Sequence, residues 1–296
     1  MNTLKQPRQA EVRQVISYLE EVDVQTGERE VLAQFDDLIE APNWTSDGRR
    51  LIYNSRGRLY SFDLATRQST PIDSGFANAC NNDHVLSPEP DNTLIAISHQ
   101  TAEDGLSRIY VLPLAGGKPT LITPMAPSYL HGWSPDGLEL AYCAERNGNY
   151  DIFTIPVDGG VERQLTDVPG LNDGPEYAPD GRHIWFNSTR SGLMQVWRMG
   201  TDGSEPTQMT WDEDSNSWFP HLSPDGSMVA YLAYRKGDVA PNAHPPNKNV
   251  EIRLMPSSGG PYRTLVRLFG GQGTINVNSW SPDGRKLAFV SYQLKS

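Results

Sequence analysis

Histidine and carboxylate side chains recur just ahead of a short motif, Ser-Pro-Asp-Gly, that the chain repeats. His84 and His131 lie two residues before the aromatic residue or leucine that precedes the motif, and Glu176 and His221 lie one residue before it. Imidazole nitrogens and carboxylate oxygens bind divalent metals and transfer protons near neutral pH, so these four residues are candidate metal ligands, acids or bases. With two asparagines ahead of the last motif, the candidate set for binding a polar ligand is His84, His131, Glu176, His221, Asn276 and Asn278.

The motif itself is better explained as a turn than as a catalytic element. It occurs six times, in complete or degraded form, with its acidic position at residues 47, 91, 136, 180, 225 and 283. In a type I turn proline fixes φ, the aspartate side chain caps the turn, and glycine accepts a left-handed backbone. A repeated fold needs many turns but has no use for six nucleophiles. The sequence also lacks the Gly-x-Ser-x-Gly pentapeptide of the α/β-hydrolases.

The spacing of the motif is typical of a β-propeller. Successive copies are 44, 45, 44, 45 and 58 residues apart, and a blade of four strands needs about 40 to 50 residues. Each unit contains short apolar or alternating segments typical of strands, and none has the periodicity of a helix. The sequence therefore predicts an all-β fold, a single six-bladed β-propeller of four-stranded antiparallel blades over residues 1–296.

The sixth blade needs strands from the other end of the chain, because only 13 residues follow Asp283 of the last motif. Residues 15–35 have the pattern of two strands joined by a turn. We expect them to complete this blade, which would leave the ring without free sheet edges. The predicted blades are residues 40–73, 80–123, 128–166, 172–210, 217–267 with an insert at 235–249, and 276–296 together with 11–35.

The two faces of the predicted disc differ. The tight motif turns lie on one face, which we call the turn face, and the longer loops lie on the other, the long-loop face. Functional residues on a rigid scaffold usually lie on such loops, and the first strand of each blade would bring the candidate set to the mouth of the central channel. In the insert, His244, Asn247 and Lys248 are expected either to cover this mouth as a lid or to belong to a tolerated surface loop. The competing interpretation is that channel residues are polar only because the channel holds water.

Composition limits the partners. The net charge is −11, from 25 basic and 36 acidic residues, and no basic run occurs, so binding to nucleic acid or to an anionic membrane is not expected. Cys80 and Cys143 have neither the spacing of a zinc site nor that of a disulfide framework. No signal-peptide pattern and no apolar run of about 18 residues is present. We expect a cytoplasmic protein that does not insert into membranes, or a periplasmic one if the natural chain begins further upstream.

The repeated unit is similar to that of a known family. Its "WSPDG" motif, its apolar second strand, the aromatic residue on its third strand and its "DGG" turn resemble the repeats of the TolB β-propeller family over residues 11–296. The resemblance implies the propeller fold. It also implies a binding role, because the namesake of the family binds proteins of the cell envelope through its propeller. Similar repeats occur in the propellers of serine peptidases and in pectate-degrading lyases.

Two functions follow from these observations. The first is a non-catalytic binding module that holds a protein, a peptide or a small polar ligand on the long-loop face around the channel, without a cofactor. The second is a hydrolase or lyase acting on a sugar-like or peptide substrate. In the second case His84, His131, His221 and Glu176 would serve as acid, base or ligands of a divalent metal in the channel.

Overall fold

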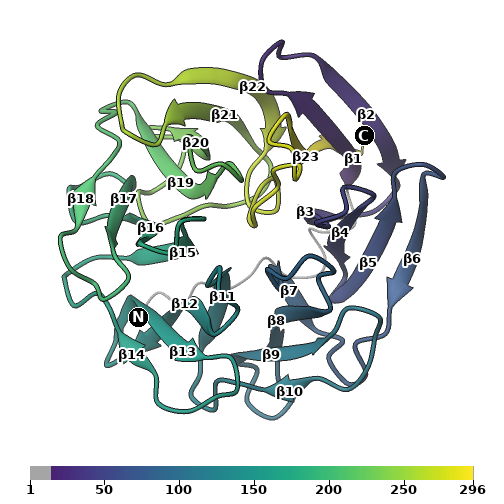
Figure 1. The fold of residues 1–296 in the computed structure, drawn as a ribbon. Helices are drawn as coiled ribbons and strands as arrows, with labels where there is room; N and C mark the ends of the chain where they lie inside the picture. Colours follow the sequence, from purple (N-terminus) through teal and green to yellow (C-terminus); the bar gives the residue numbers. More distant parts are fainter. Residues whose placement is uncertain (1–14, 296) are drawn as a thin grey trace.

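The computed structural model describes residues 15–295, which form six antiparallel sheets arranged around a central axis (Figure 1). In five of the sheets the strands follow chain order, from the channel outward. Blade 1 contains β3 (Glu40–Trp44), β4 (Arg50–Ser55), β5 (Arg58–Asp63) and β6 (Gln68–Ile72). Blade 2 contains β7 (Cys80–Leu86), β8 (Leu94–Gln100), β9 (Ser107–Pro113) and β10 (Thr120–Leu121).

The next three blades repeat this order. Blade 3 contains β11 (Ser128–Trp133), β12 (Glu139–Arg146), β13 (Asn149–Pro156) and β14 (Arg163–Gln164). Blade 4 contains β15 (Asn172–Tyr177), β16 (His183–Ser188), β17 (Gln195–Gly200) and β18 (Thr207–Gln208). Blade 5 contains β19 (Ser215–Leu222), β20 (Met228–Arg235), β21 (Lys248–Pro256) and β22 (Arg263–Gly270). The expected six-bladed β-propeller is therefore confirmed.

Blade 6 joins the two ends of the chain. Its sheet has the order β2 (Arg29–Phe35), β1 (Val15–Asp23) and β23 (Lys286–Leu294), and Leu19 of β1 lies opposite Val290 of β23. Closure by N-terminal strands is thus confirmed, although predicted residues 11–14 of this blade lie outside the described part of the chain. The innermost strand is reduced to a bridge between Trp280 and Leu287. The segment ahead of this bridge forms a loop at the channel mouth instead.

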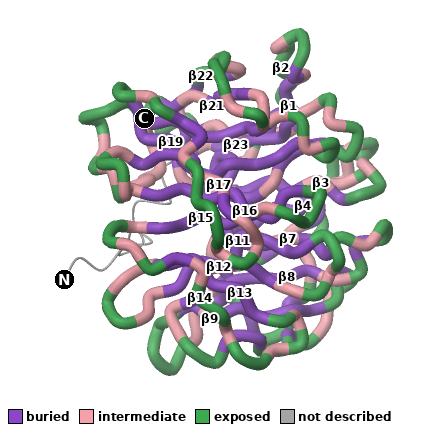
Figure 2. The backbone as a smooth tube through the Cα atoms, turned by 60° about the vertical axis from the view of Figure 1, so that its left-hand side comes forward, coloured by how far each residue is buried: buried purple, intermediate pink, exposed green. Residues whose placement is uncertain are grey.

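Apolar side chains fill the space between neighbouring blades. In each of the six blades, the second residue of the strand that follows the motif turn is fully buried. These residues are Leu51, Ile95, Leu140, Ile184, Val229 and Leu287. Figure 2 shows the same pattern along residues 15–295, with buried residues in the strands and exposed residues mostly in turns and loops. Within residues 15–295 the structure contains no long apolar helix of the kind that crosses a bilayer.

The repeated motif forms the turn that its sequence predicts. In blade 3 the Asp136 carboxylate accepts hydrogen bonds from the Ser134 hydroxyl at 2.6 Å and from the Leu138 amide at 3.0 Å. The hydrogen bond from Ser134 lowers the pKa of Asp136. Gly137 has φ 78°, the left-handed conformation that closes the turn. The aspartate therefore caps and stabilises the turn.

Candidate functional site

A β-bulge interrupts the first strand in five blades. The pairing with the second strand shifts between Glu40 and Asn43, Cys80 and His84, Leu130 and Gly132, Asp173 and Glu176, and Trp218 and His221. Three residues in these segments have a left-handed backbone, namely Ala41 at φ 58°, Gly174 at φ 60° and Phe219 at φ 54°. A bulge redirects side chains, and such strained positions are common at functional sites.

Six polar side chains come together at the mouth of the channel on the long-loop face, four of them from bulged first strands, one from the insert of blade 5 and one from the loop of blade 6. We call this set the mouth cluster, and each blade contributes one member: Glu40, Asp83, His131, Asp173, His244 and Asn276. His131 Nε2 lies 3.2 Å from Asp173 Oδ1, and His244 Nε2 lies 3.9 Å from Asp173 Oδ2. Asn276 Nδ2 donates to Asp83 Oδ1 at 2.6 Å, which joins blade 6 to blade 2.

The charges in the mouth cluster act on one another. Burial and the charge of Asp83 raise the pKa of Glu40 to about 8. Burial raises the pKa of Asp83 as well, although the positive charge of His131 opposes this shift. Burial alone would lower the pKa of His131, but Asp83 and Asp173 outweigh it and raise that pKa. Burial would raise the pKa of Asp173, yet its hydrogen bond with His131 keeps that pKa below the usual value.

A second polar layer lies deeper in the channel. We call it the lower layer, and it consists of Asn43, Glu176, His221 and Asn278. His221 Nδ1 lies 2.6 Å from Glu176 Oε2, and His221 Nε2 lies 2.6 Å from the carbonyl oxygen of Ile275. Glu176 Oε1 accepts from Asn278 Nδ2 at 2.8 Å and also from the Leu222 amide at 2.9 Å.

These contacts connect the blades below the mouth. Asn43 Nδ2 donates to the carbonyl oxygen of Asn278 at 2.6 Å. The lower layer thereby links blades 4, 5, 6 and 1 by hydrogen bonds within the described residues. Its four side chains occupy the channel beneath the mouth cluster.

The structure separates the four residues that the sequence suggested as metal ligands. His84 is fully buried in the wall between blades 1 and 2, where its Nε2 lies 3.4 Å from the carbonyl oxygen of Ile52 and burial lowers its pKa to about 4. His131 belongs to the mouth cluster, whereas Glu176 and His221 belong to the lower layer. Within residues 15–295, no group of three or more His, Cys, Asp or Glu side chains has an arrangement that could hold a metal ion.

The insert of blade 5 covers part of the mouth. His244 packs against Trp218, with ring centroids 4.3 Å apart, and against Phe219 at 5.2 Å. The carbonyl oxygen of Pro245 accepts hydrogen bonds from Tyr234 Oη at 3.0 Å and from the Gln272 amide at 3.4 Å. The insert and the loop that contains Gln272 therefore pack together above blades 5 and 6.

The other two candidate residues of the insert do not reach the mouth cluster. Asn247, with φ 61°, turns the chain toward β21, and Lys248 is the first residue of that strand. Of the three insert residues suggested by the sequence, His244 is thus the one placed beside Asp173.

Gly271 lies where the insert of blade 5 touches the loop that contains Gln272. It has φ 125°, and a Cβ atom there would collide with the carbonyl oxygen of Pro245 and lie 3.0 Å from Pro246 Cα. Gly237, with φ 91°, is a matched control, because no atom of the described residues lies within 4 Å of the place that its Cβ would take. We expect Gly271→Ala to lower the free energy of unfolding by about 1–3 kcal/mol more than Gly237→Ala does, measured by urea denaturation. Equal losses would show that the insert and the loop are not packed as described.

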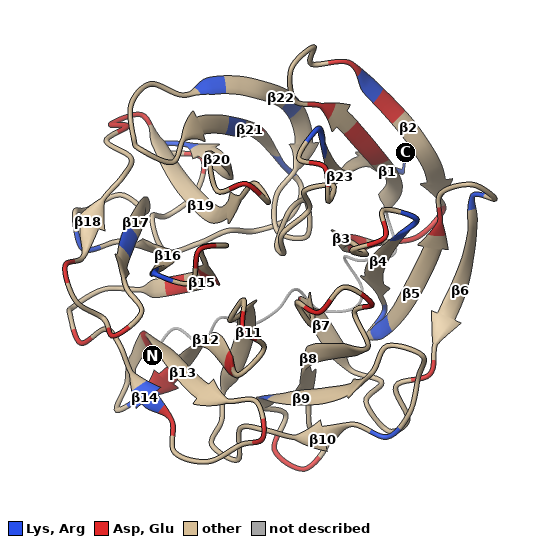
Figure 3. Ribbon diagram, viewed as in Figure 1, with Lys and Arg blue, Asp and Glu red and all other residues tan. Residues whose placement is uncertain are grey.

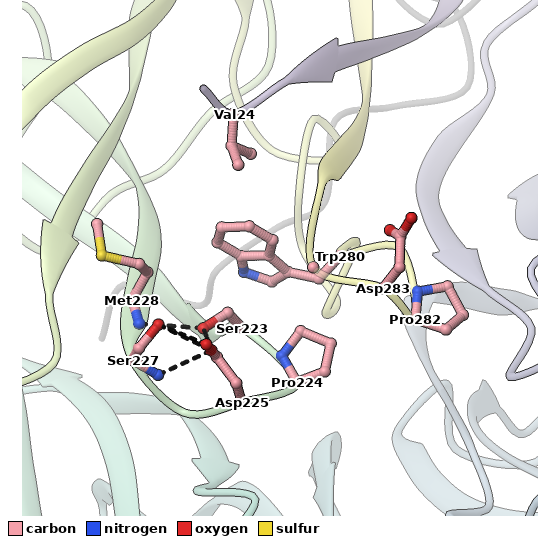
Figure 4. A pocket seen from close by; sticks show the side chains of 10 residues that line it. Val24, Ser223, Pro224, Asp225, Ser227, Met228, Trp280, Pro282 and Asp283 are labelled. Carbon is pink, nitrogen blue, oxygen red and sulfur yellow. Dashed lines mark hydrogen bonds between the residues drawn. The ribbon is translucent and has the colours of Figure 1, made fainter. Parts of the chain in front are cut away.

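A cavity of about 190 Å³ opens on the turn face between blades 5 and 6 (Figure 4). Trp280, Met228 and Val24 form much of its wall, and Asp225 and Asp283 lie beside it. The two carboxylates accept hydrogen bonds within their own motif turns. The sequence did not point to this cavity, because its wall combines the turn after β1 with two blades that are distant in the chain.

Acidic residues recur on the turn face as well. Figure 3 shows them in the turns between the first and second strands around the ring. The aspartates of these turns, such as Asp136 and Asp283, are exposed, whereas Asp83 and Asp173 in the mouth cluster are buried. Burial strengthens electrostatic interactions, so the buried carboxylates of the mouth cluster interact more strongly with neighbouring charges than the exposed aspartates of the turns do.

Comparison with known proteins identifies the family. A family model described as the TolB beta propeller domain matches residues 124–258. A protein of unassigned function from Agrobacterium fabrum is 47% identical over 277 residues, which cover 93% of this chain and 92% of that protein. This chain belongs to the TolB-like β-propeller family.

A solved structure from Agrobacterium tumefaciens, provisionally described as TolB, has the same fold as this TolB-like chain. It is 47% identical, with a TM-score of 0.89, over 94% of this chain and 99% of the other. The Tol-Pal system protein TolB of Francisella tularensis is 26% identical over 211 residues, 69% of this chain and 47% of that protein. This chain thus spans about half the length of the curated TolB proteins that it matches.

An oligogalacturonate lyase solved with manganese has the same kind of fold. It is 14% identical, with a TM-score of 0.54, over 96% of this chain and 99% of the other. At this identity the likeness concerns the fold alone.

Proposed function

We propose that this TolB-like propeller is a non-catalytic binding module whose ligand, a peptide or a polar side chain of a partner protein, binds at the mouth cluster on the long-loop face. The observation that supports this proposal is the mouth cluster itself. All six blades contribute a polar side chain to one place, on the face that also carries the long loops and the insert. A rigid scaffold that presents convergent polar groups is suited to recognising a ligand.

The hydrogen bonds favour binding over catalysis. His221 and Glu176 are the closest acid and base pair in the channel, but the Nε2 atom of His221 already faces the Ile275 carbonyl oxygen. Both oxygens of Glu176 are engaged as well. A general acid or base must reach the proton that it transfers. These side chains support the channel wall instead, and the proposed module needs neither a metal nor another cofactor.

Panning a phage-displayed library of random peptides on the immobilised protein tests the proposal. The affinity of the enriched peptides is then measured for the wild type, for Asp173→Asn in the mouth cluster and for Asp283→Asn in a turn. We expect Asp173→Asn to weaken binding at least about 10-fold, because it removes a buried charge from the binding surface. Asp283→Asn is expected to leave the affinity unchanged.

Weaker binding to Asp283→Asn than to Asp173→Asn would contradict binding at the mouth cluster. Enriched peptides that bind both variants as tightly as the wild type would contradict it as well. Circular dichroism of each variant shows whether the propeller is still folded, so that a loss of affinity reports on the surface and not on folding.

A further inference from the structure

The mouth cluster offers more hydrogen-bond acceptors than donors. Asp83 and Asp173 each bring two carboxylate oxygens, and their largest favourable charge contributions come from the histidines beside them. His131 and the Gly174 amide each provide one donor to Asp173, and Asn276 and Asn81 each provide one to Asp83. Since each carboxylate oxygen can accept more than one hydrogen bond, these donors leave acceptor capacity free.

The amide oxygen of Asn276 is an independent sign of a missing donor. Asn276 is 2% exposed, and its Oδ1 atom has no hydrogen-bond partner among the described residues. The orientation of the amide is determined by Nδ2, which faces the Asp83 carboxylate at 2.6 Å. A buried acceptor without a partner costs about 1–3 kcal/mol, so a ligand that donates to this atom would recover that energy.

The shape of the mouth limits the ligand to a small group. Asp83, His131 and Asp173 are 5%, 9% and 8% exposed, so a head group can reach them but a folded surface cannot. Phe219 packs behind the two histidines: its ring lies 6.2 Å from that of His131 and 5.2 Å from that of His244, and the residue is 2% exposed.

We propose that the mouth cluster binds a primary ammonium group, such as the head of a lysine side chain, between Asp83, Asp173 and the amide oxygen of Asn276. This inference rests on the proposed function and adds the chemistry of the ligand to it. The two carboxylates supply the opposite charge. The asparagine oxygen supplies an uncharged acceptor.

The arrangement of the acceptors favours an ammonium over a guanidinium group. Asp83, Asp173 and Asn276 belong to blades 2, 4 and 6, which alternate around the ring. An ammonium carries three donors that point in different directions, whereas a planar guanidinium pairs best with both oxygens of a single carboxylate. In this cluster both oxygens of Asp83 already have a partner, Asn276 at Oδ1 and Asn81 at Oδ2. Asp173 Oδ1 is shared by His131 and the Gly174 amide, so neither carboxylate presents two free oxygens to a planar group.

Four probes with the same carbon chain test the inference: n-butylammonium, n-butylguanidinium, 1-butanol and n-butyrate. Binding to the full chain is followed by NMR, using the imidazole resonances of His131 and His244. We expect n-butylammonium to bind at least about 10-fold more tightly than each of the other probes and to shift both imidazole signals. We also expect Asp173→Asn to weaken its binding at least about 10-fold, while Asp283→Asn leaves it unchanged.

The inference is wrong if n-butylammonium does not bind, if another probe binds as tightly, or if Asp173→Asn has no effect. If Asp173→Asn does not fold, the comparison of the four probes on the wild type decides alone. The proposed function is tested separately. Peptides that require Asp173 but tolerate replacement of every lysine by norleucine would agree with the proposed binding module. They would contradict only the inference that the bound group is an ammonium.

Discussion

Glu176→Ala is expected to lower the free energy of unfolding by about 3–5 kcal/mol, the largest loss that we predict for a single substitution. Glu176 is 7% exposed and His221 is 4% exposed, so the pair is shielded from water. Removal of the carboxylate would leave His221 without its partner at 2.6 Å. It would also leave the Leu222 amide without an acceptor and take from Asn278 Nδ2 one of its two acceptors, the other being the Leu222 carbonyl oxygen.

Urea denaturation at neutral pH measures this effect, with Glu28→Ala as the control because Glu28 is exposed. Glu176→Gln is expected to lose less stability than Glu176→Ala, since its amide keeps the volume and one oxygen acceptor. A loss for Glu176→Ala that is no larger than the loss for Glu28→Ala would mean that the lower layer does not hold blades 4, 5 and 6 together.

Glu40→Gln is expected to stabilise the protein in alkaline solution, by an amount on the order of a few kcal/mol. Burial and Asp83 raise the pKa of Glu40 to about 8 from the ordinary value of 4.5. Between these two pH values the folded protein keeps a proton on Glu40 that the unfolded chain releases. The free energy of unfolding therefore falls as the pH rises through this range, and the substitution removes that fall.

The groups that face Glu40 shape this response. Asp83 raises its pKa, the Asn82 side chain donates to it at 3.4 Å and opposes the rise, and Glu40 in turn raises the pKa of Tyr292. Urea denaturation of the wild type and of Glu40→Gln at several pH values from about 5 to about 9 tests the prediction. The difference in stability should grow with pH and then level off above about pH 8. A constant difference, or one that matches the exposed control Glu28→Gln, would contradict it.

The sequence was sufficient to predict the ring. Four of the five intervals between successive motifs are 44 or 45 residues, which is the length of one four-stranded blade. The missing outer strands of the last unit required residues 15–35 to close it, and β1 does pair with β23. The loss of the innermost strand in blade 6 could not be foreseen, because it depends on contacts of the 270–276 loop with the insert and with blade 1.

The channel was harder to predict, because counting residues along a sequence assumes that the strands are regular. A bulge changes the alternation of side chains along a strand. The side-chain directions that such counting predicts are therefore shifted by one residue or more beyond the bulge. The shift between Cys80 and His84 places His84 in the wall, while Asp83 enters the mouth cluster. Glu40 was missed for the same reason. The contact between Asn276 and Asp83 joins residues that are 193 positions apart, and no local pattern signals it.

A crystal structure of the protein in complex with one of the enriched peptides tests the central claim most directly. We predict that the peptide lies on the long-loop face, with an amino group of a lysine within hydrogen-bond distance of Asp83, Asp173 and the amide oxygen of Asn276. A peptide bound instead in the turn-face cavity beside Trp280, with the mouth cluster unchanged, would contradict the account.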